Sequence, residues 1–385
     1  MRPIYRRPVI ASQMARQLLH PGVLDEGLRS GLFLSGLRRT GKTTFLQNDL
    51  IPALEAEGAL VIYLDLWSDP QAKPADLVRI AIQATLADLQ SPASTLFARL
   101  RSIKSLNFGA AGLALGFQRE TVGTPAGPSF AEALTAIVDQ TRTDVVLIID
   151  EVQHAISTED GGQMMLALKA ARDAINPRPA TPGHFIFIGT GSHRAMVSEL
   201  TTRRNQAFVG ATSIPYPVLG PDYVTYLLDR LAKENDRPLP THAATYAAFQ
   251  TLGNRPEELL KALRDLRQYL PDGADPDQHL TVIAGVLRSR TASDELSKIE
   301  TLGPLAAAIF DQIASADGDA RGLFAADSLA RYSTLLGREV RSEEIQPLLN
   351  ELLAANLVLR RSHGVYGVTD PFVQESWREQ KRLRE

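Results

Sequence analysis

Two glycines and the polar residues around them form the segment of this sequence with the clearest chemical pattern. Gly36 and Gly41 are separated by four residues, and Lys42 and Thr43 follow directly. Because glycine has no Cβ, such a loop can turn its N–H groups inward around phosphate oxygens at close range. Lys42 would then reach the β- and γ-phosphates of a nucleotide, and Thr43 would bind Mg²⁺. The candidate nucleotide-binding residues of this segment are Gly36, Arg39, Thr40, Gly41, Lys42, Thr43 and Thr44.

Two adjacent carboxylates form the second half of the candidate site. Asp150 and Glu151 follow the apolar run 145–149, which predicts a buried strand. A carboxylate at the end of a strand beside a phosphate-binding loop can hold the hydration shell of Mg²⁺, and this role falls to Asp150. Glu151 could polarise the water that attacks the γ-phosphate. A buried strand that merely ends in a charged turn is the alternative, and its pairing with the glycine loop favours the catalytic interpretation.

Other polar residues follow predicted strands or begin predicted helices. Thr190 and Ser192 follow a strand predicted at 183–189, and their hydroxyls could contact the attacking water or the γ-phosphate. A tight turn that uses small residues for backbone reasons explains them equally well. Pro256 suits the first turn of a helix, but a cation at that end gains nothing from the helix dipole. Arg255, directly before Pro256, therefore indicates a nearby anion.

Strands and helices alternate in the first half of the chain. Apolar runs and periodicity predict strands at 32–34, 59–66, 145–149, 183–189 and 207–214, and helices at 44–53, 75–89 and 130–141. Strands buried on both faces and covered by helices indicate an α/β fold with a parallel sheet. Ser129 can cap the helix at 130–141, with Glu132 at its positive end. Residues 105–128 interrupt this order, which favours a hairpin or a rim insert over a membrane-active segment, because their apolar part is too short to span a bilayer.

The second half of the chain is predicted to be mostly helical. Helices at 223–234, 241–252 and 256–270 would form a small helical domain, followed by another helix near 280–289. The last part predicts helices at 305–314, 325–336 and 342–355, and strands at 357–361 and 365–368. Three helices followed by a hairpin are typical of a winged helix, a fold that usually indicates DNA binding.

The charge of the expected recognition helix argues against DNA. Glu343, Glu344 and Glu351 stand there against Arg341 alone, a balance that repels phosphate. Arg360 and Arg361 on the first wing strand are the remaining basic pair. DNA contact and a role in oligomer or partner contacts therefore both stay open for this domain.

Composition bounds the class of protein. The 385 residues, 44% of them hydrophobic and 22% charged, predict a globular protein of two or three domains. A formal charge of -3 gives no global reason to expect nucleic acid or anionic lipid as a partner. The absence of cysteine excludes disulfides, thiolate metal sites and cysteine nucleophiles. The N-terminus lacks the apolar core of a signal peptide and no stretch is long enough to span a bilayer, so we expect a cytoplasmic protein with no membrane contact.

Together these motifs resemble the archaeal-type AAA+ ATPases, relatives of the origin-recognition and signalling (STAND) ATPases. The likeness rests on the glycine loop, on the acidic strand end followed by Val152 and Gln153, on the turn at 189–192, and on a terminal winged helix with the segment 369–372. It implies a P-loop NTPase core at 1–217 with 105–128 as its insert, a helical lid at 218–295, and a winged helix at 296–385. It also implies ATP and Mg²⁺ as cofactors and a homo-oligomer or a partner protein.

The resemblance assigns roles position by position. Lys42 and Thr43 would bind phosphate and Mg²⁺, Asp150 would hold Mg²⁺, and Glu151 would be the catalytic base. Thr190 or Ser192 would be the sensor at the end of the fourth core strand. Arg255 or Pro256 would be the contact of the lid with the nucleotide. Arg38 and Arg39 lie inside the loop, and their side chains are expected to point away from the phosphates toward solvent, a neighbouring subunit or the lid.

Two features depart from the family pattern. Members often carry an arginine after a glycine just before the final core strand, as a finger for the nucleotide of a neighbouring subunit, whereas this chain has Gly210 and Ala211 there. Arg203 and Arg204 are nearby and could substitute. Because an arginine finger contributes roughly 10³ to 10⁵ in rate, its absence would convert a motor into a slow switch. The chain also ends too soon after the winged helix to hold the nuclease domain that members often carry.

The sequence therefore supports two functions of different kinds. The first is an ATP-hydrolysing AAA+ protein whose nucleotide state controls oligomerisation or a partner; by family analogy alone, its setting would be DNA handling, mobile elements or defence. The second is a scaffold that binds ATP with negligible hydrolysis and works as an interaction module. GTP lacks support, because no guanine-recognition motif is present.

Overall fold

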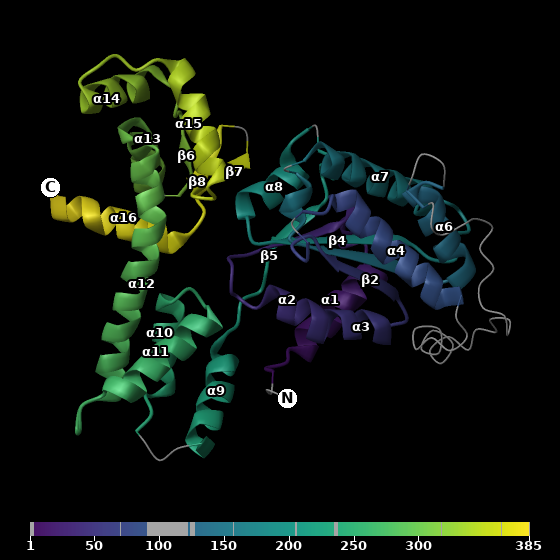
Figure 1. Cartoon of the computed structure of the whole chain (residues 1–385), viewed down its shortest axis with the longest axis horizontal. Coiled ribbons are helices and arrows are strands. Elements are labelled where there is room, and N and C mark those ends of the chain that lie inside the picture. Colours follow the sequence, from purple (N-terminus) through teal and green to yellow (C-terminus); the bar gives the residue numbers. More distant parts are fainter. Residues whose placement is uncertain are drawn as a thin grey trace.

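The chain folds into an α/β part and a helical part that lie side by side. The computed structural model describes residues 4–69, 71–90, 122–123, 128–156, 158–204, 206–234, 238–316, 318–362 and 364–384. Figure 1 shows the long helix α12 (Pro276–Thr301) joining a lower and an upper group of helices, with the α/β part beside both. Within the described residues, no helix is long and apolar enough to cross a membrane.

The α/β part is built on a five-stranded sheet whose ladders are all parallel. Its order is β2 (Leu60–Asp65), β3 (Val145–Asp150), β4 (Phe185–Gly191), β1 (Leu32–Ser35) and β5 (Thr212–Pro215). Every residue of β3 is buried, as expected for a parallel sheet covered on both faces. Because all strands point the same way, the polar residues that follow them gather at one edge. β4 lies between β1 and β3, so its end lies between the ends of the two strands that lead into the glycine loop and the acidic pair.

Helices cover both faces of this sheet. One face carries α1 (Pro8–Leu19) and the helical segment after the glycine loop, which consists of α2 (Lys42–Phe45), the π-helical η2 (Leu46–Leu50) and α3 (Ile51–Ala56). The other carries α4 (Pro74–Gln90), α6 (Phe130–Thr141) and α7 (Glu159–Ile175). Ser129 and Glu132 form the capping box of α6, which confirms the predicted start of that helix. Three short helices lie in the connections between strands: η1 (Glu26–Ser30) precedes β1, η4 (Val152–Ala155) follows β3, and α8 (Arg194–Thr202) lies between β4 and β5.

Two predicted strands differ in the structure, and one predicted insert is not tested by it. The strand predicted at 207–214 begins only at Thr212, because Phe208 turns into the core to stack on Phe187 at 4.5 Å and Gly210 adopts a φ of 84°. β4 continues two residues past Gly189 and so includes Thr190 and Gly191. The expected insert at 105–128 lies almost entirely outside the described residues.

The lower helical group is the expected lid. It consists of α9 (Pro221–Glu234), α10 (His242–Thr251), α11 (Pro256–Tyr269) and the first part of α12, whose Leu280, Ala284 and Leu287 pack in its core. The helix predicted near 280–289 is thus part of the first half of a much longer one. From Leu296 onward the same helix contributes to a different core. The boundary predicted at 295/296 falls inside this helix and stays a prediction.

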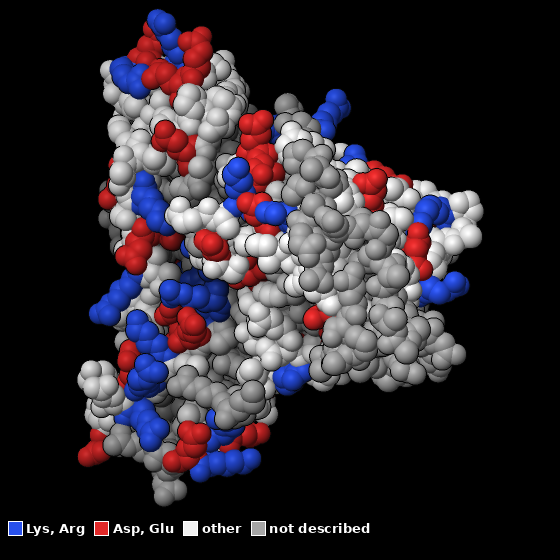
Figure 2. Space-filling view, turned by 45° about the vertical axis from the view of Figure 1, so that its right-hand side comes forward, with Lys and Arg blue, Asp and Glu red and all other residues white. Residues whose placement is uncertain are grey.

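The upper group has the order of a winged helix. α13 (Pro304–Ser315), α14 (Ala326–Leu336) and α15 (Ser342–Ala354) precede the hairpin β7 (Val358–Ser362) and β8 (Val365–Val368), and α16 (Pro371–Arg384) ends the described chain. The strand β6 (Ala320–Arg321), which sequence reasoning missed, extends the hairpin to an antiparallel sheet of order β6-β8-β7. Figure 2 shows acidic and basic side chains interspersed over this side of the helical part, without a single basic surface.

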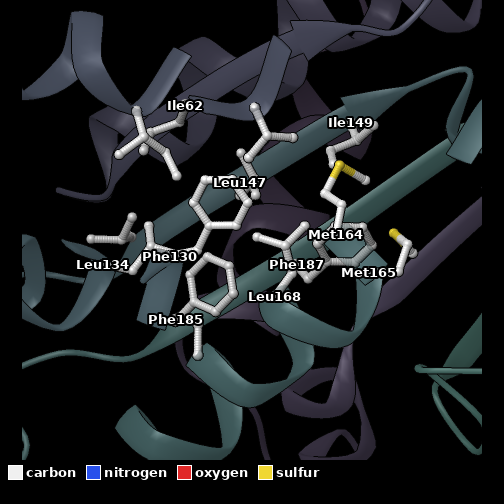
Figure 3. Close-up of a cluster of buried hydrophobic side chains, with 14 of the residues drawn as sticks. Ile62, Phe130, Leu134, Leu147, Ile149, Met164, Met165, Leu168, Phe185 and Phe187 are labelled. Atoms are coloured by element: carbon white, nitrogen blue, oxygen red, sulfur yellow. The ribbon is translucent and has the colours of Figure 1, made fainter. Parts of the chain in front are cut away.

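The core of the α/β part explains why the strand ends are held rigidly. Figure 3 shows Leu147 and Phe187 from the sheet packing against Phe130 of α6 and Met164 of α7. All four side chains are buried. Apolar burial contributes about 25 cal/mol per Å², so this cluster anchors β3 and β4 firmly between their helices. The residues at the ends of these two strands therefore have fixed positions.

Candidate functional site

The glycine loop adopts a compact conformation that its two glycines make possible. Gly41 has a φ of 90°, and a Cβ on Gly36 would lie 3.0 Å from Cβ of Tyr216. Lys42 is buried at 6% exposure, and its Nζ donates to the carbonyl oxygens of Gly36 and Leu37, each at 3.0 Å. Burial lowers the pKa of Lys42, an effect that Glu151 and then Asp150 partly oppose. The ammonium group of Lys42 therefore lies inside the loop, where it is hydrogen-bonded to the loop backbone.

Other residues of the loop have different surroundings. The Thr40 hydroxyl donates to the carbonyl of Leu37 at 2.8 Å, so this side chain closes the loop and only its backbone N–H could face a phosphate. Thr44 is exposed, and its carbonyl accepts from Asn48 of the following turn. Their assignment to nucleotide binding stays a prediction that concerns the backbone.

Tyr216 packs against the glycine loop and is hydrogen-bonded to it, a role that sequence reasoning missed. Its hydroxyl donates to the carbonyl of Gly41 at 3.0 Å and accepts from the buried guanidinium of Arg7. Arg7 also lies over the ring of Phe45, 4.5 Å from its centroid. The only sequence signal was a tyrosine between prolines 215 and 217 after the last strand.

Asp150 joins three elements at the edge of the sheet. Thr43 Oγ1 donates to Asp150 Oδ2 at 2.6 Å, and Thr190 Oγ1 donates to the other carboxylate oxygen. Tyr63 of β2 lies 3.4 Å from Oδ2. The structure thus brings together the loop, the acidic strand end and the first predicted sensor residue.

The donor set at this point fits Mg²⁺. A threonine hydroxyl beside a carboxylate is the protein share of a Mg²⁺ site in P-loop proteins, where phosphate oxygens and water complete the shell. Thr43 and Asp150 would hold the ion. No cluster of three or more His, Cys, Asp or Glu side chains occurs among the described residues.

Glu151 is held in a strained and well-defined position. Its backbone has a φ of 54° and a ψ of 43°, a region that residues other than glycine seldom adopt. Its Oε2 accepts from the Ser192 hydroxyl at 2.7 Å, from the Ser192 N–H at 3.2 Å and from the amide of Gln153. Burial alone would raise the pKa of Glu151, but these hydrogen bonds lower it further than burial raises it. The carboxylate is ionised and directed at Ser192.

Arg38 and Trp67 form the outer rim of the site. Nε of Arg38 donates to Oγ of Ser192 at 3.3 Å, and its guanidinium carbon lies 4.6 Å from the centroid of Trp67. Trp67 also packs edge-on against His154 at 5.3 Å. The expectation that Arg38 points away from the phosphates stays a prediction: its side chain is exposed, and its contacts are with Ser192 and Trp67. Sequence reasoning gave Trp67 no role.

Arg39 instead reaches the lid, as one of the expected alternatives states. Its guanidinium lies 3.6 Å from the carboxylate of Glu257 and 3.6 Å from that of Glu258, both in the first turn of α11. A nucleotide contact of Arg39 stays a prediction.

Arg255 forms an ion pair with Asp370, which directly precedes α16. Its Nη2 lies 2.7 Å from Oδ2 of Asp370, and the side chains are only 14% and 15% exposed. The anion inferred from the helix start is thus a protein carboxylate, and contact of Arg255 or Pro256 with nucleotide stays a prediction. Asp370 was noticed only as part of the terminal motif.

The candidate arginine fingers lie apart from the loop. Arg203 forms an exposed ion pair with Glu199 at 3.6 Å, and Arg204 is exposed. No hydrogen bond or ion pair among the described residues joins either to the glycine loop. Ala211, where the family pattern expects an arginine, is 9% exposed and belongs to the sheet core.

Comparison with solved structures confirms the predicted fold: the chain has the fold of the archaeal-type AAA+ ATPases. It is similar to a Walker-type ATPase of Pyrococcus abyssi, with a TM-score of 0.55, 18% identity, and coverage of 98% of this chain and 99% of the other. The ADP form of the ORC2 protein of Aeropyrum pernix is similar with a TM-score of 0.51, 13% identity, and coverage of 100% and 96%. Neither the protein-family models nor the curated proteins gave a match. At these identities the likeness establishes the fold, and function must be argued from the site.

Proposed function

We propose that this chain binds ATP with Mg²⁺ and hydrolyses it, and that its nucleotide state controls oligomerisation or the binding of a partner. The observation that carries the proposal is the pair of contacts at the sheet edge. Thr43 meets Asp150 at 2.6 Å, and Glu151, the next residue, is held by Ser192 at 2.7 Å. These contacts support the assignment of Asp150 to the metal and of Glu151 to the base, beside the loop.

Different residues of the chain would carry the separate steps of hydrolysis. The loop N–H groups and Lys42 would bind the phosphates, with the backbone oriented by Gly36 and Gly41. Mg²⁺, when bound, would neutralise phosphate charge. Glu151 would accept a proton from water as the water oxygen bonds to the γ-phosphorus and the bond to the bridging oxygen breaks, giving ADP and phosphate. The low pKa of Glu151 keeps it in the basic form near neutral pH.

The partner side of the proposal rests on the contact of the core with the winged helix. His193, beside Ser192, lies 3.2 Å through Nε2 from the carbonyl of Ala354, and Arg194 donates to the carbonyl of Thr369 at 3.1 Å. A change at Ser192 would therefore reach the winged helix through two neighbouring residues. A homo-oligomer, a partner protein or DNA could read that change. Of these, DNA has the least support, because acidic and basic side chains are mixed on the face of Figure 2.

Nucleotide binding tests the proposal directly. We expect Mg·ATP and Mg·ADP to raise the melting temperature, with a smaller effect of Mg·GTP. Lys42→Ala should weaken ATP binding about 10- to 100-fold, since a hydrogen bond to a charged group contributes about 1.5–3 kcal/mol. The exposed Lys233→Ala serves as the matched control. A wild-type protein that shows no shift with ATP at millimolar concentration would refute the proposal.

A slow switch is the second candidate. The buried Ala211 cannot present a side chain to a neighbouring copy, which favours weak hydrolysis unless another arginine acts. Multiple-turnover phosphate release separates the two candidates: its absence, with tight ATP binding, selects the scaffold. Capture of proteins from the native host with Glu151→Gln would then identify the partner of the ATP-bound state.

A further inference from the structure

Arg38 lies where a cation could act on the γ-phosphate. It is the third residue of the glycine loop, and its Nε donates at 3.3 Å to the Ser192 hydroxyl. That hydroxyl in turn donates to Glu151 at 2.7 Å. The guanidinium is thus separated from the expected base by one side chain, on the loop that would bind the phosphates.

The charge of Arg38 acts on the catalytic side of the site. Burial is the main cause of the lowered pKa of Lys42, His154 and His193, and Arg38 lowers all three further. These residues come from the loop, from η4 after the acidic pair, and from the turn after β4. The position of the guanidinium is given by its contacts with Ser192, which follows β4, and with the ring of Trp67, which follows β2.

The contacts that now hold Arg38 are weak enough to exchange. A cation–π contact at a partly exposed ring contributes about 0.5–1 kcal/mol, and Trp67 is 41% exposed. The bond to Ser192 is long at 3.3 Å. A charge-assisted, bidentate bond to phosphate is stronger than either. A phosphate within reach would therefore draw the guanidinium away from Trp67.

We propose that Arg38 is an arginine finger supplied in cis: it leaves Trp67 when ATP binds and donates hydrogen bonds to the γ-phosphate of the chain's own nucleotide during hydrolysis. The proposal rests on the ATPase function proposed above. Negative charge grows on the γ-phosphate and bridging oxygens as the bond between them breaks, and Arg38 stabilises it. Glu151 takes the proton of the attacking water, so no further reactant is needed. This assignment supplies the cation missing at Ala211.

Steady-state phosphate release tests the catalytic part. Arg38→Ala should lower kcat about 10³-fold, the lower end of the range for arginine fingers. Arg38→Lys should recover only part of the loss, because lysine keeps the charge but lacks the planar fork. The exposed Arg16→Ala is the matched control and should keep wild-type turnover. Turnover per protein should not change with protein concentration, because the finger comes from the same chain.

The fluorescence of Trp67 gives a readout that does not depend on turnover. The chain has two tryptophans, so Trp377→Phe leaves Trp67 as the single tryptophan. In that background, ATPγS with Mg²⁺ should change the emission of Trp67, and ADP with Mg²⁺ should change it much less. Adding Arg38→Ala should abolish the difference while ADP affinity stays within about threefold of the parent.

The outcomes are separable. Arg38→Ala with kcat within threefold of wild type, or an unchanged difference between ATPγS and ADP in Trp67 emission, overturns the assignment. So does turnover that rises with protein concentration and is lost in Arg203→Ala or Arg204→Ala, which would place the finger on a neighbouring copy. A wild-type protein that binds neither ATPγS nor ADP in the thermal assay refutes the ATPase function itself, and this assignment with it.

Discussion

Arg255 and Asp370 form an ion pair of 2.7 Å that joins the start of α11 in the lid to the start of α16 after the winged helix. Both side chains are more than four-fifths buried. Asp370 also accepts from the N–H of Phe372 at 2.9 Å, which fixes its orientation. Arg255 and Asp370 are 115 residues apart along the chain, and their pair holds the lid against the segment after the winged helix, at the point where the lid approaches the glycine loop.

Removing either partner of this pair should destabilise the arrangement. Asp370→Asn keeps an acceptor for Phe372 but leaves the Arg255 charge uncompensated, and breaking a buried pair costs about 3–5 kcal/mol. Urea unfolding and proteolysis at the 253–255 turn measure the effect. In the Asp370→Asn background, Arg255→Ala should lower the free energy of unfolding less than it does in the wild type, because the partner charge is already gone. If Arg255→Ala weakens ATP binding while Asp370→Asn does not, Arg255 contacts the nucleotide directly.

A side chain at Gly253 should be destabilising for two reasons, the positive φ of its backbone and a clash with Phe372, and the two can be measured separately. Its φ is 72°, and a Cβ would lie 2.6 Å from the ring of Phe372. Gly273 has a φ of 74° with nothing near its Cβ, so it is a matched control for the backbone cost alone. Gly273→Ala should cost about 1–2 kcal/mol. Gly253→Ala should cost clearly more by urea unfolding; equal costs would mean that Phe372 moves freely.

Glu151→Gln should separate binding from hydrolysis. Loss of a general base lowers kcat about 10²- to 10⁴-fold, while ATP affinity should be kept because Lys42 and the loop are untouched. Glu159→Gln neutralises an exposed carboxylate of α7 and should leave turnover unchanged. Phosphate release and nucleotide titration are the two measurements. Full activity of Glu151→Gln would remove this residue from the base role.

Ser192→Ala should lower kcat less than Glu151→Gln does. The hydroxyl positions the carboxylate at 2.7 Å, but the Ser192 N–H still donates to it at 3.2 Å. A hydrogen bond to a charged group contributes about 1.5–3 kcal/mol, which corresponds to roughly a 10- to 150-fold loss, and the remaining N–H bond keeps the expected loss near the lower end of that range. The double variant should be no slower than Glu151→Gln, because Ser192 acts through Glu151. An additive loss would show that Ser192 contacts the substrate itself.

His193 should make the contact between core and winged helix pH-dependent. Its Nδ1 accepts from the N–H of Met196, and burial lowers its pKa from the ordinary 6.5. The unfolded chain therefore takes up the proton first, so this stabilisation is complete above pH 6.5 and is lost as pH falls through the lower, folded-state value. Melting temperatures between pH 8 and 5 should fall less for His193→Asn, which keeps the cap acceptor. Parallel curves for both proteins would exclude the effect.

The local elements of this protein were predictable because their signals are local. The glycine loop at 36–41, the buried strand before Asp150 and the N-cap at Ser129 each depend on a few adjacent residues, and all three occur where they were predicted. Boundaries were less predictable. Phe208 shortened β5 because a tertiary stack outweighed local strand preference, and α12 lengthened because two domains each use part of its surface.

The sequence by itself determined which residues could do chemistry, since loop, carboxylates and hydroxyls are recognisable by type and order. Only the tertiary structure decided how they meet. The insertion of β4 between β1 and β3 brings Thr190 to Asp150 and Ser192 to Glu151. The direction of side chains could not be predicted from the sequence either. Arg38 and Arg39 are adjacent arginines, yet Arg38 contacts Ser192 and Arg39 contacts the lid. Such choices depend on backbone dihedrals and on partners that fold in from more than a hundred residues away.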